Sequence, residues 1–247
     1  MATVYQAEYA GYPVRYAFQY PKTRTYFRSW LKPVSGEEYD VSVTPEQIQQ
    51  AYELMQEGNA EDYAEYKALI GPAGRYLLRY HCCIFHSVAF LWKGRAWLLA
   101  APSGTGKSTQ FFNWRRLFPG EIMMICGDMP VLEQREDGSI WVHPTHWNGK
   151  ESIGSHASAR LGGIVVLEQA GENRMDRLTA HEALVPVVNQ FCAAPETEEE
   201  IRTMFGMLDR MLGDHPVWKL RNLGDDASTL LLRESIAEEA GGDHGAI

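Results

Sequence analysis

The sequence predicts a mixed α/β fold, in which a phosphate-binding loop follows one strand of a strand-rich sheet with flanking helices. Residues 101–109 read Ala-Pro-Ser-Gly-Thr-Gly-Lys-Ser-Thr, after an apolar run at 96–100 that is typical of a strand. Apolar residues at helical spacing follow over 109–118. A hairpin is predicted to lead into the loop, with strands 82–92 and 95–101 and a turn at Lys93-Gly94. Because a crossover helix usually feeds this strand in parallel phosphate-loop proteins, the hairpin predicts antiparallel as well as parallel pairing.

The loop fits the pattern A-x-x-x-x-G-K-S, with Ala101 where the first glycine usually stands. A strand, a glycine loop and a helix start direct several backbone N–H groups and the positive end of the helix at one point. We expect Lys107 to reach the phosphates of a nucleotide and the Ser108 hydroxyl to hold Mg²⁺. The alternative is a chance match in a turn. The residues predicted to bind nucleotide are Ala101, Pro102, Ser103, Gly104, Thr105, Gly106, Lys107, Ser108 and Thr109.

Composition narrows the function classes. The chain has 247 residues, 45% of them hydrophobic, which suffices for one large core with an appendage. A net charge of −9 without a basic block argues against nucleic acid or an anionic membrane as the main partner. The N-terminus lacks signal-peptide features, and no apolar run reaches the length of a membrane span. Four cysteines in apolar surroundings, with no C-x-x-C pair, predict buried free thiols and a cytoplasmic protein.

We expect three parts. Residues 1–79 form a strand and helix extension packed on the core, residues 80–240 form the nucleotide-binding core, and residues 241–247 form a flexible tail. In the extension, aromatic and basic residues alternate over 12–28, which indicates either sheet packing or stacking on bases, with packing favoured. Its helices are predicted from Thr44, over 60–70 with a stop at Gly71-Pro72, and over 73–80.

The core is predicted to add further strands and helices. The strands are expected at 121–126, 129–134, 139–143, 163–167, after Glu172, and at 216–220 as an edge strand. The helices are expected at 180–193, with a kink or break at Pro186, at 195–212 and at 225–240.

Asp128 stands 21 residues after Lys107, at the end of the next predicted strand. Because strand ends gather at one edge of a sheet, Asp128 is expected to face the phosphates. It would act there as a Mg²⁺ ligand or as the base for a substrate hydroxyl, unless it is only a turn residue after Gly127. Lys150 ends a polar stretch and would neutralise charge on the transferring phosphoryl group, or it is a solvated surface lysine.

Three histidines remain as candidates from residue type alone. His86 falls within a predicted strand, where a histidine is more often a hydrogen-bonded core residue than a catalyst. His143 and His146 lack a nearby third ligand, so metal binding there is only weakly indicated.

Taken together, the segments His86-Ser87, Lys93-Gly94-Arg95 and 101–109 resemble the kinase core of HPr kinase/phosphorylase, in the phosphoenolpyruvate carboxykinase-like superfamily. The chain is more similar still to uncharacterised HPr-kinase-like proteins of Gram-positive bacteria. That likeness covers roughly 80–235 and includes 127–130, 144–150, 172–177 and 216–220.

The resemblance implies a carboxykinase-like core with a mixed sheet, ATP and Mg²⁺ as cofactors, and active-site roles for His86 and Asp128. One departure matters, because HPr-directed members carry two adjacent aspartates and the first position here is Gly127. The arginine-bearing C-terminal region of true HPr kinases is not matched either, so HPr itself is not the expected substrate.

The expected function is an ATP- and Mg²⁺-dependent kinase that transfers the γ-phosphoryl group to a hydroxyl of a small molecule or a peptide. Asp128, His86 and Lys150 are the expected catalytic residues, and Ser108 and Asp128 are the expected metal ligands. The first alternative is a nucleotide-binding sensor or partner protein with little phosphoryl transfer. A carboxykinase-like reaction on an organic acid is the second. The sequence leaves the oligomeric state open, and a homo-oligomer is compatible with it.

Overall fold

The computed structural model describes residues 4–55, 60–149 and 152–241. The chain forms two compact units: an N-terminal unit of Met1–Ile84 and Cys192–Met204, and a C-terminal unit of Phe85–Phe191 and Phe205–Ile247. The N-terminal unit is therefore discontinuous in sequence, because 192–204, expected within the core, group with it. Except for Gly241, the predicted tail lies outside the described residues.

The N-terminal unit contains a small antiparallel sheet with the strand order β2-β1-β3. These strands are β1 (Tyr5–Tyr9), β2 (Tyr12–Tyr16) and β3 (Lys32–Pro33), and a 3₁₀ segment η1 covers Thr23–Trp30. The aromatic residues of this region form its core. Tyr16 and Phe27 are fully buried, with ring centroids 5.0 Å apart, and Phe18 packs on both. Packing within the unit, rather than a base-stacking surface, thus accounts for Tyr16, Phe18 and Phe27.

Three helices follow, α1 (Pro45–Glu53), α2 (Glu61–Ala68) and α3 (Ile70–Leu78), and then strand β4 (Cys82–Ile84). The predicted start at Thr44 is confirmed, because its hydroxyl and the Gln47 side chain form a capping box. The predicted stop at Gly71-Pro72 is wrong, since α3 begins at Ile70 and runs through both residues. Pro72 lies in the first turn, where no N–H is needed by the helix, so it does not break α3.

The C-terminal unit is built on a mixed sheet, as predicted. Along the path β8-β9-β10-β6-β5-β7, only the pairing of β10 with β6 is parallel, and β10 also pairs parallel with β12. The strands are β5 (Ser87–Trp92), β6 (Arg95–Ala100), β7 (Met123–Cys126), β8 (Val131–Gln134), β9 (Ile140–His143), β10 (Ala159–Gln169), β11 (Arg174–Arg177) and β12 (Val217–Asn222).

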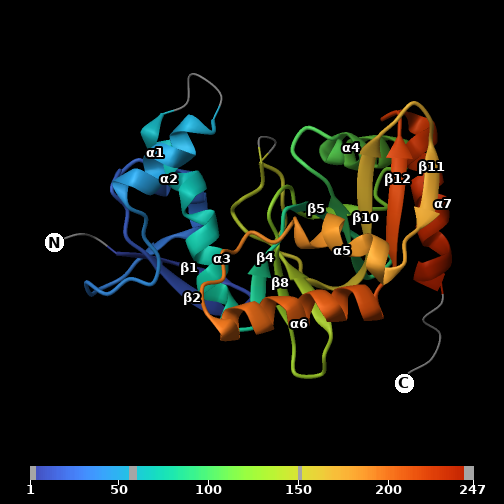
Figure 1. Ribbon diagram of the computed structural model, residues 1–247. Coiled ribbons are helices and arrows are strands. Elements are labelled where there is room, and N and C mark those ends of the chain that lie inside the picture. The colour runs from blue at the N-terminus through green and yellow to red at the C-terminus, as the bar shows by residue number, and fades with distance from the viewer. Residues whose placement is uncertain (1–3, 56–59, 150–151, 242–247) are drawn as a thin grey trace. The chain divides into compact units, whose positions relative to one another are not determined.

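Two strand predictions need correction. The strand predicted over 82–92 is interrupted, because the His86 backbone N–H donates to the carbonyl of Gln190 at 2.8 Å and leaves the ladder. The strand at 217–222 is not an edge strand, since β12 pairs with β10 on one side and with β11 on the other. Pro216 precedes β12, so the ladder loses no donor, and Figure 1 shows β11 alongside β12.

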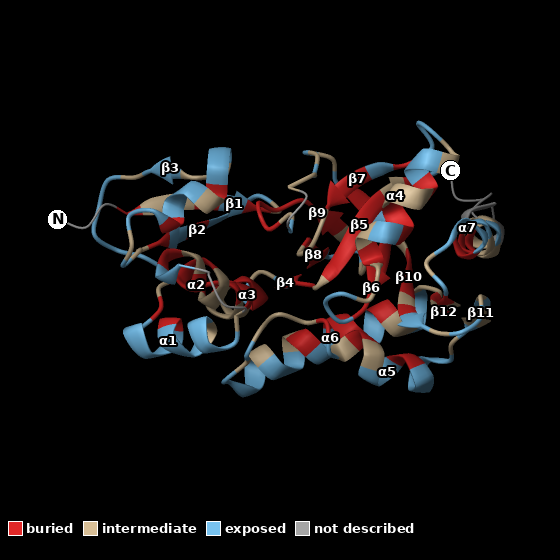
Figure 2. Ribbon diagram, turned by 90° about the horizontal axis from the view of Figure 1, so that it is seen from above, coloured by how far each residue is buried: buried red, intermediate tan, exposed pale blue. Residues whose placement is uncertain are grey.

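The helices are α4 (Lys107–Leu117), α5 (Ala180–Val188), α6 (Glu198–Asp214) and α7 (Asp226–Gly241). Pro186 lies within α5, which ends at Val188, earlier than predicted. Phe111 and Trp114 of α4, together with Leu232 and Ile236 of α7, are buried in one cluster with Phe90 of the sheet. Figure 2 shows β5, β6, β7 and β10 as a largely buried layer. No helix among the described residues has both the length and the apolar character needed to cross a membrane.

We predict opposite effects of alanine at two glycines of α3. A Cβ at Gly74 would overlap the backbone carbonyl oxygen of Cys192, whereas a Cβ at Gly71 meets nothing. Gly71→Ala should therefore raise the free energy of unfolding by about 0.5 kcal/mol, since alanine favours the helix. Gly74→Ala should lower it by about 1–3 kcal/mol through overpacking. Urea unfolding measures both; equal effects would contradict the close approach of Cys192 to α3.

We also predict a loss of stability in acid that involves His215. Burial lowers its pKa to about 4, with Asp214 opposing the shift and Arg160 and Arg95 adding to it. An unfolded histidine titrates near 6.5, so between pH 6.5 and 4 the unfolded chain binds a proton that the folded chain does not. Stability should fall over this window by up to about 3 kcal/mol for this group. His215→Gln should reduce the fall in urea titrations at pH 7 and pH 4.5.

The exposed His181 provides the matched variant, because His181→Gln also replaces a histidine of the C-terminal unit but not a buried one. Burial also lowers the pKa values of His143 and His146, so part of the slope should remain in His215→Gln. A slope in His215→Gln equal to that of the unmodified protein would contradict the assignment.

Candidate functional site

The phosphate loop lies between the end of β6 at Ala100 and the start of α4 at Lys107, so both predicted flanks are confirmed. Gly104 and Gly106 have φ values of 82° and 102°, in the left-handed region that favours glycine. The hydroxyl of Thr105 donates to the carbonyl of Pro102 at 2.9 Å and tightens the turn. The loop therefore opens directly into the N-terminus of an 11-residue helix, the arrangement that favours an anion.

The residue that replaces the first glycine of the pattern has a structural reason. Ala101 is 1% exposed and belongs to the buried cluster that includes Leu99 and Phe111. Its methyl group therefore packs in the core beneath the loop.

Lys107 lies over the loop that precedes it and is only 8% exposed. Its Nζ donates to the carbonyl oxygens of Ala101 at 2.8 Å and Pro102 at 3.3 Å, and lies 3.2 Å from Nε2 of His86. Burial lowers the pKa of the lysine, while the charge of Asp128 acts in the opposite direction. The ammonium group is thus poorly solvated and held mainly by neutral acceptors, a state that a bound anion would improve.

The break in the strand brings His86 and Asp128 together. The N–H groups of Phe85 and Ser87 donate to the carbonyls of Pro130 at 3.0 Å and Asp128 at 2.8 Å, which fixes the segment after β7 beside His86. Oδ1 of Asp128 lies 3.4 Å from Nε2 of His86, and the two side chains are 22% and 21% exposed. Three residues singled out from the sequence, Lys107, His86 and Asp128, therefore meet at the mouth of the loop.

Both neighbours of His86 approach the same nitrogen. Without a proton, Nε2 can accept from Lys107; with a proton, it can donate to Asp128. It cannot do both at once. The position of Lys107 and the presence of a proton on Nε2 of His86 are consequently linked.

Gly127 has no room for a side chain. A Cβ there would lie 2.6 Å from the backbone oxygen of Asn148 and 3.1 Å from that of Ile153. The N–H of Gly127 also donates to Oδ1 of Asn148 at 3.0 Å. A second carboxylate beside Asp128 is therefore excluded by the backbone that faces it.

The structure describes most, but not all, of the other residues predicted to be functional. Lys150 lies outside the described residues. Ser108 is the second residue of α4, next to Lys107, and its joint role with Asp128 in holding Mg²⁺ stays a prediction. No group of three or more His, Cys, Asp or Glu among the described residues is arranged to hold a metal ion. His146 is instead 4% exposed and packed on Trp147, and His143 contacts Ser158 and Glu133.

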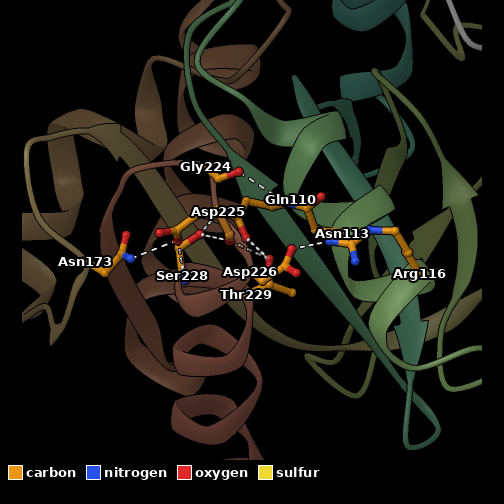
Figure 3. Close-up of polar contacts among 9 residues, drawn as sticks. All are labelled: Gln110, Asn113, Arg116, Asn173, Gly224, Asp225, Asp226, Ser228 and Thr229. Carbon is orange, nitrogen blue, oxygen red and sulfur yellow. Dashed lines mark hydrogen bonds and ion pairs between the residues drawn. The ribbon is translucent and has the colours of Figure 1, made fainter.

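A polar network that the sequence did not reveal fastens α4 to α7 (Figure 3). Gln110, one turn after Lys107 and fully buried, donates to Oδ1 of Asn222 at 3.2 Å and to Oγ of Ser228 at 2.6 Å. Its Oε1 accepts from the hydroxyl of Thr229 at 2.8 Å. Nearby, Asn113 donates to the carbonyl of Gly224 at 3.1 Å. Because these partners are more than 100 residues away in sequence, no local pattern could have indicated them.

A polar cavity of about 470 Å³ lies within the N-terminal unit, and none of the predicted site residues lines it. Arg75 on its wall is held by Glu196 and Glu200.

Neither a protein-family model nor a curated protein matches the chain. Among solved structures, the Hpr(Ser) kinase/phosphatase from Coxiella burnetii is similar, with a TM-score of 0.35 and 10% sequence identity. The match covers 64% of this chain and 99% of that chain. Such a likeness is a distant one in fold alone, so residue roles have to come from the geometry described above.

We predict that Gln110 is the main polar support of α4. Gln110→Ala removes three buried hydrogen bonds and should lower the free energy of unfolding by about 2–3 kcal/mol. Asn113→Ala, on the same helix, removes one partly buried bond and should cost about 1 kcal/mol. Chemical denaturation compares the two; an equal or smaller cost at Gln110 would contradict the network.

Proposed function

We propose that the chain is an ATP- and Mg²⁺-dependent kinase that transfers the γ-phosphoryl group to a hydroxyl of a small molecule or a peptide. One observation carries this proposal: the Lys107 ammonium, the His86 imidazole and the Asp128 carboxylate meet where the glycine loop opens into α4. A cation, a titratable base and an acid at a helix N-terminus are the groups that phosphoryl transfer needs.

In this proposal the loop residues 101–109 bind the polyphosphate through their backbone N–H groups and the N-terminus of α4. Lys107 turns from the carbonyls of Ala101 and Pro102 toward the phosphates. This rotation of the Lys107 side chain exchanges neutral acceptors for anionic oxygens. The negative charge of the phosphates then opposes the effect of burial, which lowers the pKa of the lysine.

The same movement prepares the base. Once Lys107 leaves Nε2 of His86, that nitrogen can take the proton of the acceptor hydroxyl and donate it in a hydrogen bond to Asp128. His86 then acts as the base, and Asp128 stabilises the imidazolium that forms. The partial exposure of both side chains leaves room for an acceptor to approach.

Ser108 and Asp128 fit a hard cation, because both offer oxygen ligands beside the loop. Mg²⁺ supplies neutralisation of phosphate charge when it is bound. Lys150, by its place in the sequence, would add a further positive charge. The four cysteines form no disulfide among the described residues, which supports a reducing compartment such as the cytoplasm.

A nucleotide-binding sensor with little transfer is the second candidate. The observation that favours it is Gly127, where the backbone of Asn148 excludes a second carboxylate. A site with one acid can still hold nucleotide while lacking the full set of groups for catalysis.

We predict that Lys107→Ala weakens nucleotide binding strongly. Loss of a charge-assisted contact to phosphate should lower affinity for Mg·ATP by about 100-fold, measured by calorimetry. The exposed Lys93 gives the matched lysine variant, and Lys93→Ala should bind like the unmodified protein. If Lys107→Ala and the unmodified chain bound Mg·ATP with equal affinity, the loop would have no part in nucleotide binding.

His86→Gln separates the two candidates. It should retain Mg·ATP binding and lose transfer of labelled phosphate to an acceptor found by mass spectrometry of metabolite and peptide libraries. If the unmodified chain binds nucleotide and yields no phosphorylated product in those libraries, the sensor replaces the kinase.

A further inference from the structure

Away from the phosphate loop, three neighbouring strand segments of the C-terminal unit carry a glutamate, a histidine and a serine in a row. Glu133 belongs to β8, His143 ends β9, and Ser158 immediately precedes β10. The register pairs Ala159 with Val142, which places Ser158 beside His143. Antiparallel pairing of β8 with β9 brings Glu133 to the same face.

The three side chains are joined through both nitrogens of the imidazole. Oγ of Ser158 lies 2.9 Å from Nδ1 of His143, and Oε2 of Glu133 lies 3.0 Å from Nε2. The histidine and glutamate side chains are only 9% and 11% exposed, whereas Ser158 is on the surface. The base is therefore shielded from water and the hydroxyl is accessible. A serine is activated when its hydroxyl is hydrogen-bonded to a base and a carboxylate orients that base, which is the arrangement found here.

The charges around Ser158 favour a neutral, basic imidazole at His143 and an anionic ligand near Arg160. Burial lowers the pKa of His143, with Glu133 opposing the shift, so the imidazole is neutral at neutral pH and able to accept a proton. Nε of Arg135 donates to the same oxygen of Glu133, Oε2, at 2.9 Å. Arg160 follows Ser158 by two residues, which places it on the same face of the strand. It is exposed, and no ion pair to it is found among the described residues, although its charge contributes to lowering the pKa of Asp137.

We propose that Ser158 is the nucleophile of a second, hydrolytic site, which cleaves esters whose acyl group carries a negative charge. His143 is its general base, Glu133 is the residue that positions His143, and Arg160 is the contact for the negative charge. This proposal does not rest on the kinase function.

The reaction balances with water as the co-reactant. Oγ of Ser158 attacks the ester carbonyl while its proton passes to Nδ1 of His143. The bond to the alcohol breaks, and that proton leaves with the alcohol. Water then attacks the acyl-serine, gives one proton to His143, and releases the carboxylic acid as the proton returns to Ser158.

The site also lies apart from the phosphate loop. Ser158 precedes the first residue of β10, while Gln169 at the other end of β10 donates to the carbonyl of Gly104 at 3.4 Å. Eleven residues of extended strand separate the two, which corresponds to about 35 Å. A change at Ser158 should therefore leave nucleotide binding intact, which keeps the two proposals separable.

The test uses the full chain and a fluorophosphonate probe, which forms a phosphorus–oxygen bond with an activated serine and releases fluoride. We expect stoichiometric labelling that peptide mass spectrometry maps to Ser158. Ser158→Ala should lose the label. The exposed Ser35, which lies in the N-terminal unit, provides the matched serine, and Ser35→Ala should be labelled like the unmodified chain. Labelling of Ser158 should exceed that of the heat-denatured chain by about 100-fold in rate, because only the folded chain supplies the base.

Two further variants test the roles of the partners. Glu133→Gln should slow labelling by about tenfold or more while Ser158 stays the labelled residue, because its amide still bonds His143 but no longer stabilises the imidazolium. Arg160→Gln should reduce hydrolysis of the p-nitrophenyl monoester of succinate relative to p-nitrophenyl acetate by about tenfold, because the contact for the negative charge is lost.

Several results would overturn the proposal. The label could appear on a residue other than Ser158, persist in Ser158→Ala, or form no faster in the folded than in the denatured chain. Because Ser158 is at the surface, loss of folding is not expected in Ser158→Ala, and retained Mg·ATP binding or an unchanged circular dichroism spectrum verifies this.

Discussion

The pairing of β10 is the constraint on which the C-terminal unit depends. One 11-residue strand runs antiparallel to β9 at its start and parallel to β6 and β12 along its later part. The parallel pairing with β6 places the ends of both strands at one edge, where the phosphate loop begins. The antiparallel pairing with β9 places Ser158 beside His143 at the opposite end. A single strand thus sets the position of both proposed sites.

At the phosphate loop, the surroundings of the Lys107 ammonium group disfavour its positive charge. Lys107 is buried, its pKa is lowered, and two of its three contacts are carbonyl oxygens of its own loop. The third contact is a histidine nitrogen that Asp128 also approaches. In the proposed kinase, phosphate binding draws Lys107 away from Nε2 of His86. The same nitrogen can then accept a proton, so anion binding and proton acceptance are linked through one imidazole.

Patterns of neighbouring residues in the sequence predicted the structural features that depend on interactions between neighbours in the chain. The glycine loop, the strand and helix around it, the cap at Thr44 and the hairpin β5–β6 all follow from residues close in the chain, and each has its counterpart in the structure. The hairpin also predicted the mixed sheet. The meeting of Asp128 with Lys107 followed from one general rule, that strand ends gather at a sheet edge.

What the sequence did not reveal depends on distant partners. The break at His86 arises from a bond to Gln190, and the interior place of β12 from a later pairing with β11. Gln110 finds its partners in β12 and α7, so it read as an ordinary polar residue on a helix. Glu133, His143 and Ser158 meet only because three strands lie in register, and a motif search along the chain has no means to place them together.

The tight contact at Gly127 limits how this site could change over time. The backbone of Asn148 occupies the space that a side chain at 127 would need, and the amide of Asn148 is bonded to Gly127 in turn. A second acid at this position could not arise through one codon change alone, since the facing segment would also have to be rebuilt. Whatever chemistry occurs here has accordingly been shaped around a single carboxylate, and any broadening of it has to recruit groups from elsewhere in the chain.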